Sequence, residues 1–315
     1  MSSIPPVVGG AIPDRWLVRA VLGTIAAVGL LLFQSGLTID ARGSMVALVA
    51  LGGLLLTRSM YGVDRVRRVR HRIARDAAEY VGLAAAVCLF GAIASYPDAA
   101  GSSGFVDAKL QAIDHFLGFD WLAWYRLVAA HPLLQSGGRI AYAAVFITPL
   151  ILLGYFAYTG RQGEARLFIS AFWLAAVLTL LLFHFLPAAG PLAWLWRGPI
   201  PYMPTSALYT AHLIPLLRHH SLHRINLVEL RGLVCVPSFH AACAVLYTLA
   251  AWPVARLRWP VTAVNAAMLL ATPVEGTHYL ADMIAGAGVA VLAWAMMLAV
   301  IRRLPGTAQS TFTAV

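Results

Sequence analysis

Blocks of apolar residues, separated by short polar segments, run along almost the whole chain. A membrane-spanning helix needs about 20 predominantly apolar residues. By that measure the pattern predicts eight spans, at 16–34, 41–57, 77–96, 139–158, 167–186, 234–254, 260–276 and 279–301. The second and seventh blocks are the shortest of the set. We therefore expect an all-α polytopic integral membrane protein.

The composition excludes the main alternatives to a membrane protein. Of the 315 residues, 60% are apolar and only 11% are charged, whereas about 25% of a soluble globular chain is charged. Disorder requires low hydrophobicity and high charge. The three cysteines, Cys88, Cys235 and Cys243, have no metal or redox spacing, so we expect free thiols. Lys109 is the only lysine, which indicates a GC-rich, bacterial genome.

The basic residues predict the orientation of the spans. The formal net charge is +10, from 23 basic and 13 acidic residues, and in a soluble protein this excess would suggest a nucleic-acid partner. Segment 58–75 holds seven arginines, so the positive-inside rule places it in the cytoplasm. Eight spans then place both termini and the other arginine pairs on the same side. We therefore expect a multi-pass protein of the inner membrane whose excess charge faces the anionic inner leaflet, with no nucleic-acid partner.

Two long segments then lie outside the cytoplasm. Segment 97–138 has apolar residues and tryptophans at a roughly helical period, so it is either an amphipathic helix on the membrane surface or a loop packed over the bundle. Segment 187–233 is rich in proline, arginine and histidine. We divide the chain into a two-span extension at 1–76, a catalytic membrane domain at 77–303, and a polar tail at 304–315 that we expect to be disordered.

Ionisable residues inside membrane spans are costly and are candidates for function. His240 lies at the start of the sixth predicted span, and Glu275, His278 and Asp282 lie around the start of the eighth. The predicted topology brings all four to the extracytoplasmic face. Glu275 is either a structural partner in this site or a solvated residue at the membrane edge, and we slightly favour the second interpretation.

The spacing of these residues indicates phosphoryl chemistry. His278 and Asp282 are four residues apart and share one face of a predicted helix, so the carboxylate can orient the imidazole as a nucleophile. His240 is the candidate general acid. Ser238 precedes it as a predicted N-cap, and helix N-termini bind phosphate. The alternatives are a structural His–Asp pair, a serine that only caps, and a metal triad of two histidines and a carboxylate; a metal would leave the phosphate-binding features unexplained.

Two segments resemble known motifs. Pro237-Ser238-Phe239-His240 and Gly276-Thr277-His278-Tyr279-Leu280-Ala281-Asp282 resemble the second and third signature motifs of the type 2 phosphatidic acid phosphatase superfamily. The resemblance covers about 80–302 and implies a six-helix core preceded by two added spans. It also implies that His278 forms a phosphohistidine, Asp282 orients it, His240 is the general acid and Ser238 contacts phosphate. It implies no metal and no cofactor.

The chain departs from the phosphatases at the first motif, Lys-x6-Arg-Pro. The corresponding place reads His184-Phe185-Leu186-Pro187-Ala188-Ala189-Gly190-Pro191, without lysine or arginine. The Ser-Arg that precedes the third motif is replaced by Ala271-Thr272, and the Gly of Pro-Ser-Gly-His is replaced by Phe239. These features look like the inositol phosphorylceramide synthase branch, which transfers a phosphorylated headgroup between lipids.

The missing cations need a replacement, because a phosphoryl transition state spreads negative charge over its oxygens. We expect at least one arginine of the outer loop to fold back over the site, with a further candidate at the outer end of the fourth span; the candidates are Arg197, Arg218, Arg224, Arg231 and Arg139. The alternative role for any one of them is to bind lipid headgroups at the interface.

The sequence thus favours a membrane lipid phosphotransferase, with a phospholipid and a lipid hydroxyl as its substrates. The alternative is a lipid phosphate phosphatase that uses the same residues with water as acceptor. A transporter is a third class, but no pair of related halves is visible in the sequence. Since one histidine must be neutral and the other protonated, we expect a bell-shaped pH–rate profile. The sequence leaves the particular lipids and the oligomeric state open.

Overall fold

The computed structural model describes residues 14–40 and 68–303. Its helices are α1 (Asp14–Ser35), α3 (Arg68–Gly101), α4 (Asp107–Phe116), α5 (Trp121–Ala130), α6 (Pro132–Thr159), α7 (Gln162–Phe185), α8 (Pro191–Leu195), α9 (Tyr209–Arg218), α10 (Phe239–Ala251), α11 (Ala255–Glu275) and α12 (Leu280–Arg303). Two short strands, β1 (Thr38–Ile39) and β2 (Arg224–Ile225), pair in parallel. The predicted all-α class is confirmed.

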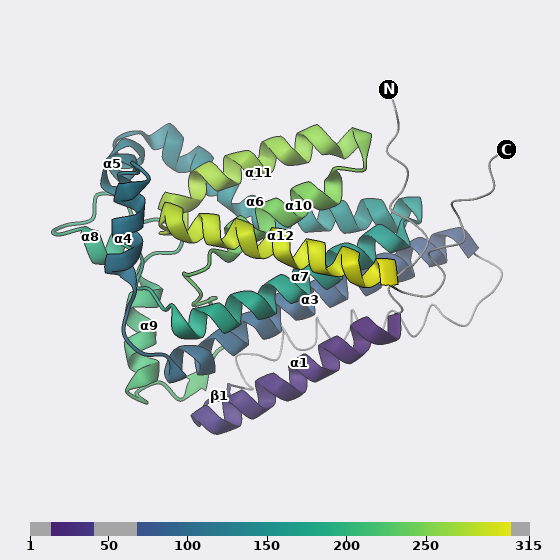
Figure 1. Ribbon diagram of the computed structural model, residues 1–315, viewed down its shortest axis with the longest axis horizontal. Coiled ribbons are helices and arrows are strands. Elements are labelled where there is room, and N and C mark those ends of the chain that lie inside the picture. The colour runs from purple at the N-terminus through teal and green to yellow at the C-terminus, as the bar shows by residue number, and fades with distance from the viewer. Residues whose placement is uncertain (1–13, 41–67, 304–315) are drawn as a thin grey trace.

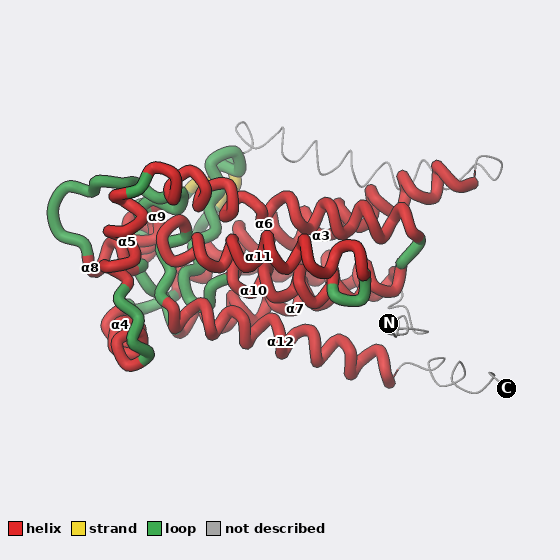
Figure 2. The backbone as a smooth tube through the Cα atoms, turned by 90° about the horizontal axis from the view of Figure 1, so that it is seen from above, coloured by secondary structure: helices red, strands yellow, loops and turns green. Residues whose placement is uncertain are grey.

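The long helices form a bundle with one elaborated end. In Figure 1, α3, α6, α7, α10, α11 and α12 run side by side, and α1 lies against α3 on the flank. The short helices α4, α5, α8 and α9 gather at one end of this bundle, which is also clear in the perpendicular view of Figure 2. We call this the site end, because the candidate catalytic residues lie there.

Five of the described helices are long and apolar enough to cross a membrane, namely α1, α3, α6, α7 and α12. The chain is therefore a multi-pass membrane protein. The sixth predicted span, 234–254, is shorter than expected: α10 begins only at Phe239 and has 13 residues, which is about 20 Å of helix. Residues 234–238 enter the bundle as irregular, non-helical chain instead. The predicted span 41–57 and the tail 304–315 lie outside the described residues.

The apolar residues divide between the interior and the outer surface of the bundle. Leu152, Phe156 and Phe168 are completely buried where α6 and α7 face the other helices. Large apolar side chains such as Phe146 and Leu292 are exposed on the outer faces of α6 and α12. A soluble protein rarely exposes so many, whereas lipid tails are a favourable environment for them.

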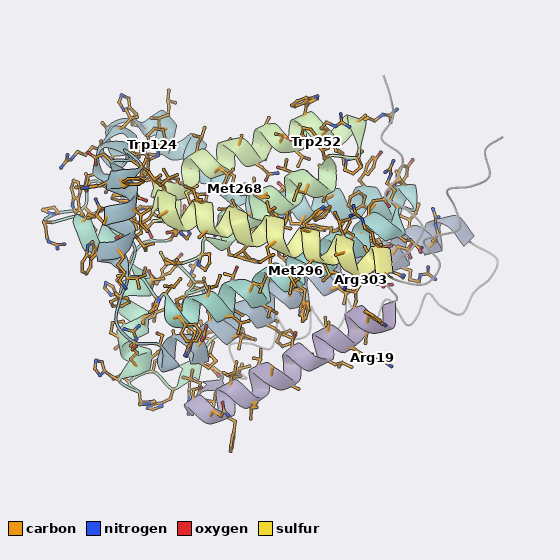
Figure 3. The ribbon with its side chains drawn as sticks, viewed as in Figure 1. Arg19, Trp124, Trp252, Met268, Met296 and Arg303 are labelled. Atoms are coloured by element: carbon orange, nitrogen blue, oxygen red, sulfur yellow. The ribbon has the colours of Figure 1, made fainter. Side chains whose placement is uncertain are left out.

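The end of the bundle opposite the site holds ion pairs between arginines and carboxylates. Arg161 forms an ion pair with Glu164 at 3.0 Å, and Gln162 donates to Asp76 at 3.2 Å, which joins the starts of α7 and α3. Figure 3 places Arg19 and Arg303 at this same end. Clusters predicted to share one side of the membrane therefore do meet at one end. Which side of the cell that end faces stays a prediction.

Segment 97–138 forms two helices that pack over the bundle, which favours the second of the two sequence interpretations. Trp121 in α5 is buried and donates its indole N–H to the carbonyl of Pro273 at 2.8 Å. Tyr125 donates to the carbonyl of Tyr202 at 2.7 Å. Ile113, however, is 46% exposed, so the outer face of α4 keeps an apolar character. The predicted division at 76/77 falls within the continuous helix α3 and stays a prediction.

Candidate active site

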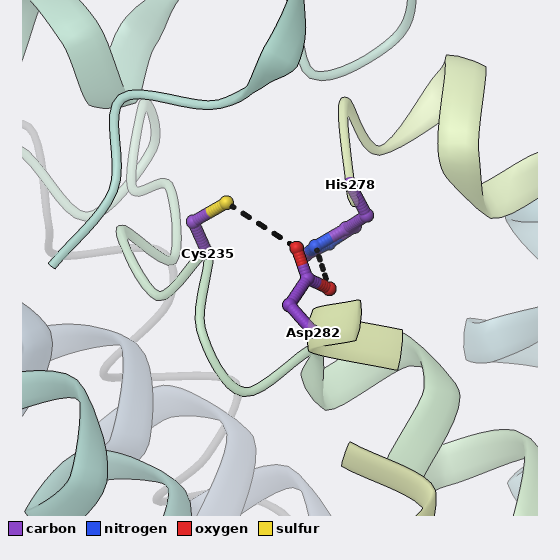
Figure 4. Close-up of side chains that lie close together, drawn as sticks. All are labelled: Cys235, His278 and Asp282. Carbon is purple, nitrogen blue, oxygen red and sulfur yellow. Dashed lines mark hydrogen bonds and ion pairs between the residues drawn. The ribbon is translucent and has the colours of Figure 1, made fainter. Parts of the chain in front are cut away.

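His278 and Asp282 lie at the junction between α11 and α12. The chain leaves α11 at Glu275, turns through Gly276–Tyr279 and enters α12 at Leu280. His278 Nδ1 is 3.0 Å from Asp282 Oδ1, and both side chains are buried. Figure 4 shows this contact. The sequence placed both residues on one helix, but His278 lies in the turn just before it. The pair still forms because Asp282 is in the first turn of α12.

The other carboxylate oxygen fixes the position of Asp282. Its Oδ2 accepts the backbone N–H of Tyr279 at 2.9 Å, as an N-terminal cap would. Oδ1 is therefore the oxygen that faces the imidazole. The ring N–H does not point along the 3.0 Å line, so the contact is an ion-pair approach and not a linear hydrogen bond. The arrangement still directs Nδ1 toward the carboxylate and leaves Nε2 for chemistry.

His240 faces His278 from the first turn of α10. The centroids of the two imidazole rings are 6.1 Å apart, with the planes tilted by 54°. His240 stacks on Tyr142 of α6, at 4.2 Å between centroids, and its Nδ1 is 3.2 Å from the Tyr142 hydroxyl. This spacing brings both imidazoles within reach of one bound group of phosphate size.

Ser238 connects the second motif to the third. It is completely buried, and its Oγ accepts the N–H of Ala241 at 3.3 Å, so it is the N-cap of α10 as predicted. Its own N–H donates to the carbonyl of Asp282 at 3.1 Å. Gly286 makes this contact possible, because a Cβ there would lie 2.1 Å from the Ser238 carbonyl oxygen. The predicted contact between Ser238 and phosphate stays a prediction.

Two aspartates of α4 hold the third motif in place. Asp114 is completely buried and accepts the N–H groups of Leu280 and Ala281, at 3.0 and 2.8 Å. These groups belong to the first turn of α12 and have no partner within their own helix. Asp107, two turns earlier on the same face of α4, accepts the Tyr279 hydroxyl at 3.0 Å.

Asp107 also holds the segment that stands where the first motif would be. It accepts the N–H groups of Ala189 and Gly190 at 2.9 and 3.0 Å. Gly190 has a φ of +96°, and a Cβ there would lie 3.1 Å from the Thr277 carbonyl oxygen. The segment therefore approaches the third motif closely although it lacks lysine and arginine. His184, also in this segment, pairs instead with Asp98 at 2.8 Å.

Glu275 is a buried structural residue, and the interpretation of a solvated side chain at the membrane edge is wrong. It is 1% exposed. Its carboxylate accepts hydrogen bonds from the Tyr202 hydroxyl and from the N–H and hydroxyl of Thr205, and its carbonyl accepts two bonds from Ser206. Three donors compensate this buried carboxylate, and the same bonds anchor the outer loop to the end of α11.

The candidate arginines are spread around the site end, and the contacts of Arg139, Arg231 and Arg218 are with groups other than the two histidines. Arg139 donates its Nε–H to the Tyr202 hydroxyl at 3.0 Å and is thereby joined to Glu275. Arg231 lies over the Tyr209 ring at 5.4 Å. Arg218 binds Ser102 and the carbonyl of Gly104, and burial lowers the pKa of its guanidinium.

The remaining two candidates are exposed. Arg197 donates to the carbonyl of the adjacent Trp196 at 3.0 Å, and Arg224 lies on β2 with its side chain toward solvent. A role for any of the five in binding phosphate stays a prediction. Arg139 has the most direct bonded connection to the third motif, through Tyr202 and Glu275.

Several residues of the site were not predicted. Tyr142 and Cys235 carry no sequence signal that separates them from ordinary core residues. Cys235 Sγ lies 3.8 Å from Asp282 Oδ2, and Cys235, His278 and Asp282 could together hold a metal ion. Asp107 and Asp114 did carry a signal. They are seven residues apart with Leu110 between them, so they share one face of the predicted helix.

The fold and the site together define a class: a helical membrane protein with a His–His–Asp cluster at one end of the bundle, in which His278 and Asp282 are buried and His240 is partly buried. A family model described as the PAP2 superfamily matches residues 108–296, which run from α4 into α12. The chain therefore belongs to this superfamily of type 2 phosphatidic acid phosphatases, whose members typically catalyse phosphoryl transfer or hydrolysis. Searches of curated proteins and of solved structures returned no significant match.

Proposed function

We propose that this protein is a lipid phosphotransferase similar to inositol phosphorylceramide synthases. In this reaction a phosphorylated headgroup moves from a phospholipid to a lipid hydroxyl through a phosphohistidine at His278. The observation that supports it best is the 6.1 Å between the rings of His240 and His278, with Asp282 against the latter. Two imidazoles at that spacing can flank a single phosphorus, one to attack it and one to protonate the leaving oxygen.

In the first step His278 Nε2 attacks phosphorus and the bond to the diacylglycerol oxygen breaks. His240 gives its proton to that oxygen, so diacylglycerol leaves as an alcohol. In the second step the acceptor hydroxyl loses its proton to His240 and its oxygen attacks the phosphohistidine. The nitrogen–phosphorus bond breaks, His278 is regenerated neutral, and His240 is again protonated. Asp282 stabilises the imidazolium character that develops on His278.

Transfer, as opposed to hydrolysis, requires that water be kept from the phosphohistidine. His278 is 4% exposed, and the outer loop is bound over the site by Glu275. This enclosure favours a lipid hydroxyl over bulk water as acceptor. The absence of the first-motif cations points the same way, since it is the feature that resembles the transferase branch.

The negative charge of the transition state needs donors. We propose Arg139 as the first candidate among the five arginines. Its partner Tyr202 is hydrogen-bonded to Glu275, which directly precedes the third motif. Release of Arg139 from Tyr202 would let its guanidinium turn toward a bound phosphate. We also propose that the site end faces the extracytoplasmic side, as the arginine distribution predicts.

The experiment that separates transfer from hydrolysis uses purified protein and phospholipid labelled in its headgroup phosphate. It is incubated with and without a ceramide or diacylglycerol acceptor, and the products are separated. We expect label in a new lipid only when the acceptor is present. Free headgroup phosphate as the only product in both samples would replace this proposal with the phosphatase alternative.

A further inference from the structure

Cys235 lies beside the proposed catalytic pair, yet the proposed reaction does not use it. It lies in the non-helical segment before α10, and its Sγ is 3.8 Å from Asp282 Oδ2 and 3.9 Å from the Thr277 carbonyl oxygen. Figure 4 shows Cys235 and His278 on opposite sides of the Asp282 carboxylate. A sulfur from the segment before α10 thus converges with an imidazole nitrogen and a carboxylate oxygen from the turn between α11 and α12 and the start of α12.

The three ligand atoms lie within 4.8 Å of one another. A zinc-class ion binds sulfur at about 2.3 Å and nitrogen or oxygen at about 2.0–2.2 Å. The ligands of one tetrahedral ion are then roughly 3.3–3.7 Å apart. The 3.8 Å between Sγ and Oδ2 is slightly longer than this range, and the 3.0 Å between Nδ1 and Oδ1 is slightly shorter. Small side-chain rotations would bring the sulfur, the nitrogen and one carboxylate oxygen around a single ion.

A second observation points to a ligand at the same place. His278 Nδ1 and Asp282 Oδ1 are both buried, and among the described residues neither has a partner in hydrogen-bonding geometry, although they approach to 3.0 Å. Buried polar atoms without aligned partners are costly. A metal ion between them would satisfy both atoms at once.

The chemistry of the donors selects the ion. Thiolate with imidazole and carboxylate is a zinc-type set, whereas magnesium and calcium prefer oxygen alone. One thiolate and one carboxylate also neutralise a divalent cation, which a buried site requires. Three protein ligands leave a fourth position for water or a phosphate oxygen.

We propose that Cys235, His278 and Asp282 form a binding site for a zinc-class divalent cation, and that the bound ion inactivates the enzyme. On binding, the thiol of Cys235 releases its proton to the buffer, and the lone pairs of the three side chains coordinate the ion. His278 is then held by the metal and Asp282 no longer orients it. The inactivation rests on the proposed function, but the binding does not.

Cadmium is the probe, because a thiolate–cadmium bond gives an ultraviolet charge-transfer band. The chain has three cysteines, of which Cys88 is exposed, so a Cys88→Ser background removes the accessible thiol. In this background we expect one equivalent of cadmium and a clear band. Cys235→Ala should abolish both, and Cys243→Ala, the matched control at another buried thiol, should keep both. A band that survives in Cys235→Ala, or no band in the background chain, would overturn the site.

Two further measurements test the metal site independently of cadmium. X-ray absorption on the unaltered chain with one equivalent of zinc should show one sulfur at about 2.3 Å, and a shell of nitrogen and oxygen alone would contradict the proposal. In the transfer assay, zinc should inhibit Cys235→Ser at least about tenfold more weakly than the unaltered protein; equal inhibition would exclude regulation through this site. If the unaltered chain binds cadmium yet shows no phosphoryl chemistry, the proposed function fails and the metal site stands.

Discussion

Asp114 accepts the backbone N–H of Ala281 at 2.8 Å, across 167 residues of chain. A second bond from Leu280 makes this carboxylate the cap of α12, supplied by another helix. The start of α12 is where His278 and Asp282 meet. The outer segment is therefore part of the support of the site and not only a cover for the bundle.

Replacing Asp114 by Ala should lower both stability and turnover. Two buried N–H groups lose their acceptor, which costs about 1–3 kcal/mol, and the turn that holds His278 loosens. The matched control is Asp120→Ala, because Asp120 caps α5 at an exposed position, accepting from Ala123 at 3.0 Å. We expect that control to cost about 1 kcal/mol and to keep its activity. Thermal unfolding and the transfer assay together measure both effects, and equal turnover in the two variants would contradict the support role.

The catalytic pair predicts a steep loss of activity without loss of fold. His278→Ala should abolish turnover, and Asp282→Asn should reduce it by about 10²–10⁴-fold, the range for a positioned proton-transfer group. The control is His184→Ala, which breaks the pair with Asp98 at 2.8 Å outside the cluster and should keep most of the activity. Trapping of a labelled phosphoenzyme in the control, and its absence in His278→Ala, would identify the nucleophile. Full activity in His278→Ala would end the mechanism.

The two-histidine mechanism also predicts the pH dependence of the rate. His278 must be neutral to attack and His240 must be protonated to donate, so the profile of kcat/KM should be bell-shaped. Activity that is flat from about pH 5 to 9 would count against it.

Tyr142 should modify this profile through His240. Its hydroxyl is 3.2 Å from His240 Nδ1 and can accept a bond from the protonated ring, and bonds from charged donors are the stronger ones. In Tyr142→Phe the alkaline limb of the pH–rate profile, which reports loss of the His240 proton, should move to lower pH. The value of KM should change little. Tyr247→Phe is the control, because Tyr247 of α10 donates its hydroxyl to the carbonyl of Val145, which lies on α6 as Tyr142 does. An unchanged profile in Tyr142→Phe would restrict Tyr142 to packing.

Two glycines of α12, two residues apart, give a direct test of the packing at the second motif. A Cβ at Gly286 would lie 2.1 Å from the Ser238 carbonyl oxygen, whereas nothing lies within 4 Å of one at Gly288. Gly286→Ala should therefore destabilise the protein by about 1–3 kcal/mol or more and lower activity. Gly288→Ala should be neutral or stabilising by up to about 1 kcal/mol. Thermal unfolding of the two variants side by side measures the difference, and equal unfolding temperatures would show that α12 does not pack as described.

The anchor at Glu275 predicts how stability depends on alkaline pH. Burial, with the hydrogen bond to Glu275, raises the pKa of Tyr202 to about 12 against the effect of Arg139, from an ordinary value of 10.0. A raised pKa means that the contribution of Tyr202 is complete below pH 10 and is lost as the pH rises through about 12. Tyr202→Phe should be less stable at neutral pH, by about 1.5–3 kcal/mol, and should lose less stability between these two pH values.

Thr205→Val is the control for that experiment. It removes a hydrogen bond of 2.5 Å to the same carboxylate but no titratable group. Its stability should fall by a constant amount across the alkaline range. If the free energy of unfolding fell in parallel with rising pH for Tyr202→Phe and the unaltered protein, Tyr202 would not be the group responsible for the alkaline loss of stability.

The sequence predicted what depends on local spacing. His240, His278 and Asp282 come together because two motifs lie at the ends of one helical hairpin, and the spacing within the third motif fixes its carboxylate near its histidine. Long-range contacts gave no such signal. The burial of Glu275 depends on hydrogen bonds from Tyr202 and Thr205, which are 73 and 70 residues away in the chain. Local sequence shows only a carboxylate at a helix end, and for that reason we expected a solvated side chain. The length of α10 was overestimated, because hydrophobicity alone does not separate buried irregular chain from helix.

The two-stranded sheet of β1 and β2 connects parts of the chain that are far apart in the sequence. Thr38 donates its N–H to the His223 carbonyl at 2.9 Å, and Asp40 donates to that of Ile225, also at 2.9 Å. The segment that follows α1 is thus hydrogen-bonded to the same outer loop that Glu275 also binds. A chain that lacked α1 and β1 would lose this strand pair, so we expect the N-terminal extension to help hold the outer loop at the site end.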